Sequence, residues 1–193
     1  AGADLDWMRA SVDLDAEANR VEGLRLATLF ATIDACPVPV VAAVHGHALG
    51  GGAGLVATVD IAVAQTDTMF GFTEVRIGLI PATISPYVID RIGTTAARRY
   101  LLTAELFDAT EAQRIGLVSA VADDAAAEAE RLVETLLTVG PDAVRITKKL
   151  VRERPSNEDL ARLISEVRAS AEGQAGLQAF LAREDPPWRS ARS

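Results

Sequence analysis

A run of glycines that directly follows an apolar segment constrains the fold of this chain more than any other feature. Residues 50–54 read Gly-Gly-Gly-Ala-Gly, and they come after the β-branched, apolar segment 38–44. This segment predicts a buried strand, and the apolar residues 55–59 predict a helix after the glycines. A strand, a glycine turn and a helix aim free backbone N–H groups and a helix N-terminus at a ligand oxygen. A turn that only allows close packing is the alternative, but four glycines in five positions favour a ligand.

The glycine run does not have the spacing of a nucleotide phosphate motif. Gly50, Gly52 and Gly54 do not complete a Gly-x-Gly-x-x-Gly pattern, because no Gly or Ala fits the third slot. No Lys-Ser or Lys-Thr follows the glycines, as a P-loop requires. The turn therefore predicts backbone amides that face an oxyanion.

Length and composition limit the remaining classes. The 193 residues fit one domain with at most a small appendage, and 49% of them are hydrophobic, which is enough for a substantial core. The net charge of −8 argues against a nucleic-acid partner, because phosphate binding needs clustered Lys and Arg. A single cysteine, Cys36, excludes an intrachain disulfide and predicts a cytoplasmic protein. No segment reaches the roughly 18 apolar residues of a membrane span.

Apolar periodicity predicts an α/β core (residues 1–121) that is followed by a helical region (residues 122–193). Extended segments are expected at 38–44, 60–64, 69–72 and 117–121. Helices are expected at 16–34, 50–57, 85–92, 94–103, 110–116, 123–139, 141–153, 156–170 and 173–183, after a short amphipathic stretch with Leu5, Met8 and Val12 on one face. Several late helices have apolar faces without an obvious partner, which predicts an oligomer. The chain begins without Met, and we expect that an N-terminal portion precedes it.

Several motifs occur in a characteristic order: Ala-Gly-Ala-Asp-Leu at 1–5, Pro-Val-Val-Ala-Ala-Val-His-Gly at 39–46, Ala-Leu-Gly-Gly-Gly at 48–52, Asp-Ile-Ala-Val-Ala at 60–64, Phe-Gly-Phe-Thr-Glu at 70–74, Gly-Leu-Val at 116–118 and Ala-Phe-Leu at 179–181. Together they resemble the crotonase (enoyl-CoA hydratase/isomerase) superfamily. The resemblance implies an α/β spiral of ββα turns and a C-terminal helical trimerisation region. It also implies acyl-CoA thioester substrates, no cofactor apart from the coenzyme A of the substrate, and a homotrimer or a hexamer of two trimers.

The same resemblance assigns roles to individual residues. It implies that the backbone N–H groups of Ala3 and Gly51 form an oxyanion hole for the thioester oxygen, and preorganised donors of this kind contribute a few kcal/mol each. It implies that Glu74 transfers the proton. Burial among Phe70, Phe72, Ile77 and Leu79 would raise the pKa of Glu74 toward the working pH. The other residues expected at the substrate are Ala1, Asp4, Leu5, Gly50, Ser85 and Arg183.

One expected carboxylate is missing. Hydratases of this superfamily typically use a second glutamate after the glycine run, and that position holds Gly54. A single carboxylate resembles the enoyl-CoA isomerases. The stretch 74–88, with Ile-Ser-Pro in place of the usual Gly-Ala-Gly-Gly-Thr, resembles instead a branch that hydrates methylglutaconyl-CoA and isohexenylglutaconyl-CoA. We therefore expect a hydratase of leucine degradation or fatty-acid metabolism, with an isomerase and a non-catalytic paralogue as alternatives.

Other polar residues are open to two readings. His45 and His47 share one strand face, but no third ligand has a suggestive spacing, and no metal site is expected. Asp4 and Asp60 are typical of capping and turn residues. Arg76 and Ser85 are candidates for contact with a polar acyl group. The basic stretch 145–154 is either a solvated helix face or a contact for the coenzyme A 3′-phosphate.

Overall fold

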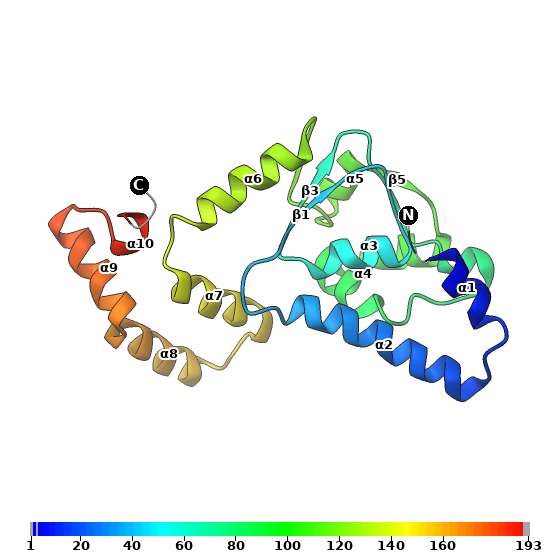
Figure 1. Ribbon diagram of the computed structural model, residues 1–193, viewed down its shortest axis with the longest axis horizontal. Coiled ribbons are helices and arrows are strands. Elements are labelled where there is room, and N and C mark those ends of the chain that lie inside the picture. Colours follow the sequence, from blue (N-terminus) through cyan, green and yellow to red (C-terminus); the bar gives the residue numbers. More distant parts are fainter. Residues whose placement is uncertain (1, 3, 191–193) are drawn as a thin grey trace. The chain divides into compact units, whose positions relative to one another are not determined.

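The structure is a computed structural model that describes residue 2 and residues 4–190 (Figure 1). It divides into two compact units, one of residues 1–36 and 40–129 and the other of residues 37–39 and 130–193. The predicted division at 121/122 lies earlier in the chain.

The strands described in the first unit form two small sheets. In one sheet β1 (Val41–Val44), β3 (Ile61–Gln65) and β6 (Ala120–Ala122) run parallel in the order β1-β3-β6. In the other, β2 (His47–Leu49) pairs in parallel with β4 (Met69–Gly71), and β5 (Phe107–Asp108) pairs antiparallel with β4. Gly46, with φ 68°, joins β1 to β2. A positive φ is accessible to glycine without strain, so the chain passes from one sheet to the other within two residues.

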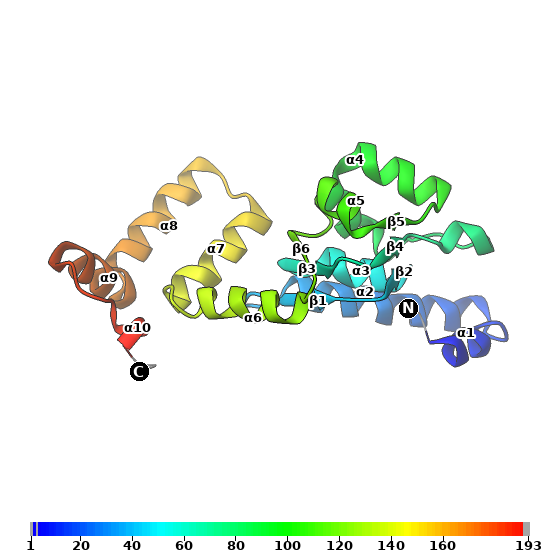
Figure 2. The ribbon, with the colours of Figure 1, turned by 90° about the horizontal axis from the view of Figure 1, so that it is seen from above.

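Helices of the first unit surround a small apolar helix. This helix, α3 (Gly51–Thr58), packs against both α2 (Ala16–Asp34) and α4 (Ser85–Thr103), as Figures 1 and 2 show. Its small side chains allow the close approach, and Ala53 has no exposed surface. Two further helices, α1 (Leu5–Ser11) and α5 (Ala109–Arg114), complete the unit together with a 3₁₀ turn.

Local signals explain where the predicted helices begin and end. The bounds of α2 are those predicted, because Asp15 accepts a hydrogen bond from the N–H of Ala18 and caps the helix. The two helices expected at 85–92 and 94–103 are both present within α4, and they meet at Gly93, whose non-helical φ of 71° and ψ of 163° kink the chain between them. The strand expected over 38–44 begins only at Val41. The N–H of Val40 donates instead to Asp60 Oδ2 at 2.7 Å.

The second unit is helical where the structure describes it. After α6 (Ala125–Leu136), which spans the boundary, come α7 (Pro141–Glu153), α8 (Asn157–Ala169), α9 (Ala171–Ala182) and α10 (Pro187–Ser190). Both α7 and α8 pack against α9 (Figure 2). Phe180 and Leu181 on α9 are each 79% exposed. No helix in the described part of the chain is both long and apolar enough to cross a membrane.

Four short elements were not expected from the sequence. They are β2, the 3₁₀ turn η1 (Glu74–Ile77), β5 and α10, each of four residues or fewer. Segments this short carry too little periodicity to be recognised. Val12 is the C-cap residue of α1, with helical φ −63° and ψ −34°, and it is 81% exposed.

Candidate active site

The glycine turn places the N-terminus of α3 at the end of β2. Gly50 has φ 50° and ψ −121°, a backbone conformation that side chains disfavour, and its N–H donates to the carbonyl of Gly71 at 2.8 Å. The helix starts at Gly51. The first N–H groups of a helix have no acceptor within the helix. The N–H of Gly51 is therefore free of the helical ladder, as an oxyanion donor must be.

The carboxylate of Glu74 lies directly against this turn. A Cβ atom on Gly50 would come within 3.3 Å of Glu74 Oε1. Glu74 opens the 3₁₀ turn η1 (Glu74–Ile77), and the N–H of Leu79 donates to its carbonyl at 3.1 Å. The side-chain oxygen Oε2 is buried and has no hydrogen-bond partner among the described residues. A carboxylate oxygen without a partner is suited to receive a ligand or a water molecule.

The environment of Glu74 raises its pKa above the ordinary 4.5, because burial disfavours the charged form. The raised pKa agrees with the prediction from its neighbours, but only part of the predicted apolar wall is present. Phe70 and Phe72 are buried, whereas Ile77 is 62% exposed and Leu79 is 54% exposed. A single 3₁₀ turn packs only one side against the protein, and Gly78, with φ 76°, turns the chain away after it.

The opening loop meets the glycine turn on another side. A Cβ atom on Gly2 would lie 3.0 Å from the carbonyl oxygen of Leu49, and one on Gly52 would lie 3.2 Å from the backbone nitrogen of Gly2. The two segments that the resemblance assigns to the oxyanion hole are therefore in contact at these residues. Ala1, Ala3 and the side chain of Leu5 lie outside the described residues, so their roles remain predictions.

Two predicted polar residues have structural partners. Asp4 caps α1, since its carboxylate accepts from the N–H groups of Asp6 and Trp7 at 2.8 and 3.1 Å. Asp60 accepts the N–H of Val40, which confirms its structural reading. The carboxylate of Asp4 is thus occupied by the helix N-terminus, and a substrate contact there remains a prediction.

The candidates for contact with a polar acyl group lie at the two ends of α4. Ser85 begins the helix, and its hydroxyl donates to the carbonyl of Ala82 at 3.2 Å. The guanidinium of Arg76 donates to the carbonyl of Ala104, the C-cap residue. One of the donors of Arg76 is therefore used to close the end of α4.

The basic stretch of α7 is paired with acidic residues. Arg145 forms an ion pair with Asp142, and both Lys149 and Arg152 pair with Glu153 at 3.9 and 3.2 Å. These pairs favour the reading of a solvated helix face over that of a phosphate site. Arg183, the C-cap residue of α9 with φ 60°, is exposed in the second unit.

The described residues contain no group of three or more His, Cys, Asp or Glu side chains that could hold a metal ion. His45 and His47 are both exposed.

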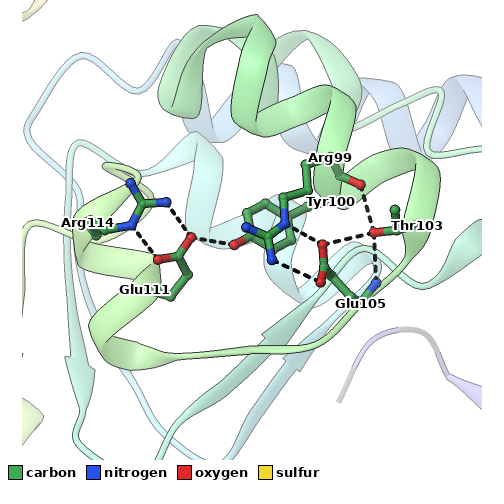
Figure 3. Close-up of polar contacts among 6 residues, drawn as sticks. All are labelled: Arg99, Tyr100, Thr103, Glu105, Glu111 and Arg114. Atoms are coloured by element: carbon green, nitrogen blue, oxygen red, sulfur yellow. Dashed lines mark hydrogen bonds and ion pairs between the residues drawn. The ribbon is translucent and has the colours of Figure 1, made fainter.

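Two polar clusters that join elements of the first unit were missed in the sequence. Arg91 donates to the carbonyls of Val59, Asp60 and Leu117 and so joins the end of α3 to the segment before β6. The second cluster joins α4 to α5 and contains the side chains shown in Figure 3, which are Arg99, Tyr100, Thr103, Glu105, Glu111 and Arg114. Arg91 gave no local signal in the sequence, because its acceptors lie more than 20 residues away along the chain.

Known proteins resemble this chain over nearly its whole length. The family described as "Enoyl-CoA hydratase/isomerase" matches residues 1–191. An enoyl-CoA hydratase from Shewanella pealeana has a crystal structure with a TM-score of 0.91 and 39% identity, covering 97% of this chain and 73% of that one. The structure of Pseudomonas aeruginosa AtuE gives a TM-score of 0.90 and 39% identity, with 97% and 76% covered. A crotonyl-CoA hydratase from Syntrophomonas wolfei is 34% identical over 94% of this chain and 72% of its own length. This chain has the crotonase fold and belongs to the enoyl-CoA hydratase/isomerase family.

Proposed function

We propose that this protein is an enoyl-CoA hydratase, which adds water across the α,β double bond of an enoyl-CoA thioester. The observation that carries the proposal is the position of Glu74, whose partly buried carboxylate lies beside the glycine turn and has one oxygen without a hydrogen-bond partner in the described part of the chain. The names of the relatives also favour a hydratase.

The reaction needs stabilisation of negative charge on the thioester oxygen. Attack of water on the β-carbon converts the thioester into an enolate, and the N–H groups of Gly51 and Ala3 would donate to its oxygen. Donors that are already in place are effective because they need no reorganisation as the charge develops. The contact of Gly2 with the glycine turn supports the convergence of these two donors.

Glu74 would accept one proton and donate one proton during the addition. Its ionised carboxylate accepts a proton from the attacking water, and the resulting acid then donates a proton to the α-carbon. The sum is one water molecule added across the double bond, with Glu74 returned to its initial state. A pKa raised above the ordinary 4.5 suits this role, because the same group has to act first as a base and then as an acid.

An enoyl-CoA isomerase is the second candidate, because only one of the two expected carboxylates is present. Gly54 cannot transfer a proton. In an isomerase Glu74 would remove a proton at one carbon of the acyl chain and return it at another, without water. The same oxyanion hole would hold the intermediate.

For the substrate we propose a glutaconyl-type thioester, on the strength of the sequence of the stretch 74–88. Coenzyme A would enter as part of the substrate, with no separate cofactor. We further propose a cytoplasmic homotrimer or hexamer, and the exposed Phe180 and Leu181 of α9 support self-association.

The experiment that tests the reaction measures the loss of the enoyl-thioester absorbance with crotonyl-CoA. We expect Glu74→Gln to lower kcat by about 10²–10⁴-fold, the usual contribution of a general acid–base group. Glu130→Gln is the matched control, since Glu130 is an exposed carboxylate on α6. Full turnover by folded Glu74→Gln would refute the proposed role.

The alternatives are separated by the substrate supplied. Conversion of a 3-enoyl thioester to its 2-enoyl isomer, without hydration of the 2-enoyl form, would identify an isomerase. No turnover of either thioester would favour the non-catalytic paralogue. A higher kcat/KM for a glutaconyl-type thioester than for crotonyl-CoA is expected, and equal values would contradict the substrate assignment.

A further inference from the structure

The place next to Gly54 is filled by another side chain. A Cβ atom on Gly54 would lie 2.2 Å from Cγ2 and 2.8 Å from Cβ of Ile84, and 3.3 Å from Cε1 of Phe30. Carbon atoms essentially never approach to the first two distances without displacement of the structure. Any residue other than glycine at position 54 therefore collides with Ile84.

Ile84 cannot easily move out of this place. Its side chain is 2% exposed, and Phe30 beside it is 3% exposed. The carbonyl of Ile84 accepts the N–H of Val88 at 3.0 Å, so its backbone belongs to the first turn of α4. A branched side chain on a helix has restricted χ1 rotation, and the surrounding core is closely packed.

This contact lies close to the candidate catalytic group. The N–H of Gly54 donates to the carbonyl of Gly50 at 3.0 Å, so the two glycines are one helical turn apart. Gly50 faces the carboxylate of Glu74, since a Cβ atom built on it would lie 3.3 Å from Oε1. Ile84 therefore places apolar surface against Gly54, which is one helical turn along α3 from the glycine that faces Glu74. A second carboxylate would extend from this position.

We propose that Ile84 is a positioning residue that excludes a second acid from the site, so that Gly54 and Ile84 form one steric unit and Glu74 acts alone. The absence of a glutamate at position 54 is then not an isolated loss. It is coupled to the isoleucine that takes up the space. This inference rests on the proposed function for its catalytic meaning, whereas the steric coupling does not depend on it.

The steric coupling is tested by the stability of a set of variants. Gly54→Ala should lower the Tm by about 4–10 °C, as expected for an overpacked core. In the background of Ile84→Gly, which removes both colliding carbons, Gly54→Ala should lower the Tm little or not at all. Ile84→Ala should relieve the effect only in part, because its Cβ would remain 2.8 Å away. Gly23→Ala is the control, since a Cβ on Gly23 meets nothing within 4 Å.

The catalytic meaning is tested by exchanging the two residues. Gly54→Glu alone should fold poorly, whereas in the Ile84→Gly background the same substitution should lower the Tm much less. In the Glu74→Gln background this exchange should raise the hydration of crotonyl-CoA by at least about tenfold, a part of the usual acid–base contribution. Ile84→Gly alone should not raise it. With Glu74 present, the exchange should add a second ionisation to the pH profile of kcat/KM.

Each outcome decides between the claims. An unchanged Tm for Gly54→Ala, or a loss of Tm that is the same with and without Ile84→Gly, would overturn the steric unit. A folded exchange variant with neither rescue of Glu74→Gln nor a second ionisation would overturn the exclusion of an acid. If the wild-type protein hydrates no enoyl thioester, the proposed function fails, and the stability series still decides the coupling.

Discussion

The hydroxyl of Tyr100 makes a buried, charge-assisted hydrogen bond whose removal has a calculable effect. Tyr100 on α4 is 2% exposed, and its hydroxyl donates to Oε1 of Glu111 on α5 (Figure 3). The same carboxylate accepts from Nε and Nη2 of Arg114 at 2.5 and 2.7 Å. The hydrogen bond therefore joins α4 to α5.

Tyr100→Phe removes this bond and little else. The ring keeps its contact with Phe107, whose centroid is 4.3 Å away. A hydrogen bond to a charged group contributes about 1.5–3 kcal/mol. Glu111 retains Arg114 and is 24% exposed, so water replaces part of the lost bond. We expect the free energy of unfolding to fall by about 1–2 kcal/mol and the Tm by about 2–8 °C.

The pH dependence gives a second measurement. The hydrogen bonds from Arg114 and then Tyr100 lower the pKa of Glu111 from 4.5 to about 2. A lowered folded pKa means that the stabilisation is complete above about pH 4.5 and is lost as the pH falls toward about 2. Chemical unfolding should therefore show that Glu111→Gln is less stable than wild type above about pH 4.5, and that this difference in the free energy of unfolding disappears as the pH falls toward about 2.

The control is the ion pair of Arg99 with Glu105, whose side chains are 58% and 38% exposed. Glu105→Gln should change the Tm much less than Tyr100→Phe does, because exposed ion pairs contribute little to stability. A Tyr100→Phe variant as stable as wild type, or an effect of Glu111→Gln that does not depend on pH between about 2 and 7, would refute the reasoning.

Two other substitutions have effects of known sign. Arg91→Met should lower the free energy of unfolding by about 2–4 kcal/mol, because it strands backbone carbonyls such as that of the fully buried Leu117; a change below about 0.5 kcal/mol in chemical unfolding would contradict the assigned bonds. Glu74→Gln should be more stable than wild type at neutral pH, because the raised pKa of Glu74 means that ionisation opposes folding as the pH rises above 4.5. Thermal unfolding should show this advantage vanish below about pH 4.5, and a less stable variant at neutral pH would indicate a structural role.

The sequence predicts structure best where a local signal exists. Helical apolar spacing predicts the bounds of α2 correctly, since periodicity is a local signal. Apolar residues near Glu74 in the sequence correctly indicate a raised pKa, and its cause in the structure is burial of the carboxylate. The exposure of Ile77 and Leu79 does not follow, because apolar residues near a candidate site need not face it.

The sequence by itself determined the glycine turn, the family and the single glutamate beside a missing partner. These depend on residue identities and short spacings, which are written along the chain. Only the tertiary structure decided that Ile84 occupies the space beside Gly54 and that Oε2 of Glu74 has no partner in the described residues. Such contacts join residues distant in sequence, and they depend on how helices pack, which periodicity specifies only as a face and not as a neighbour.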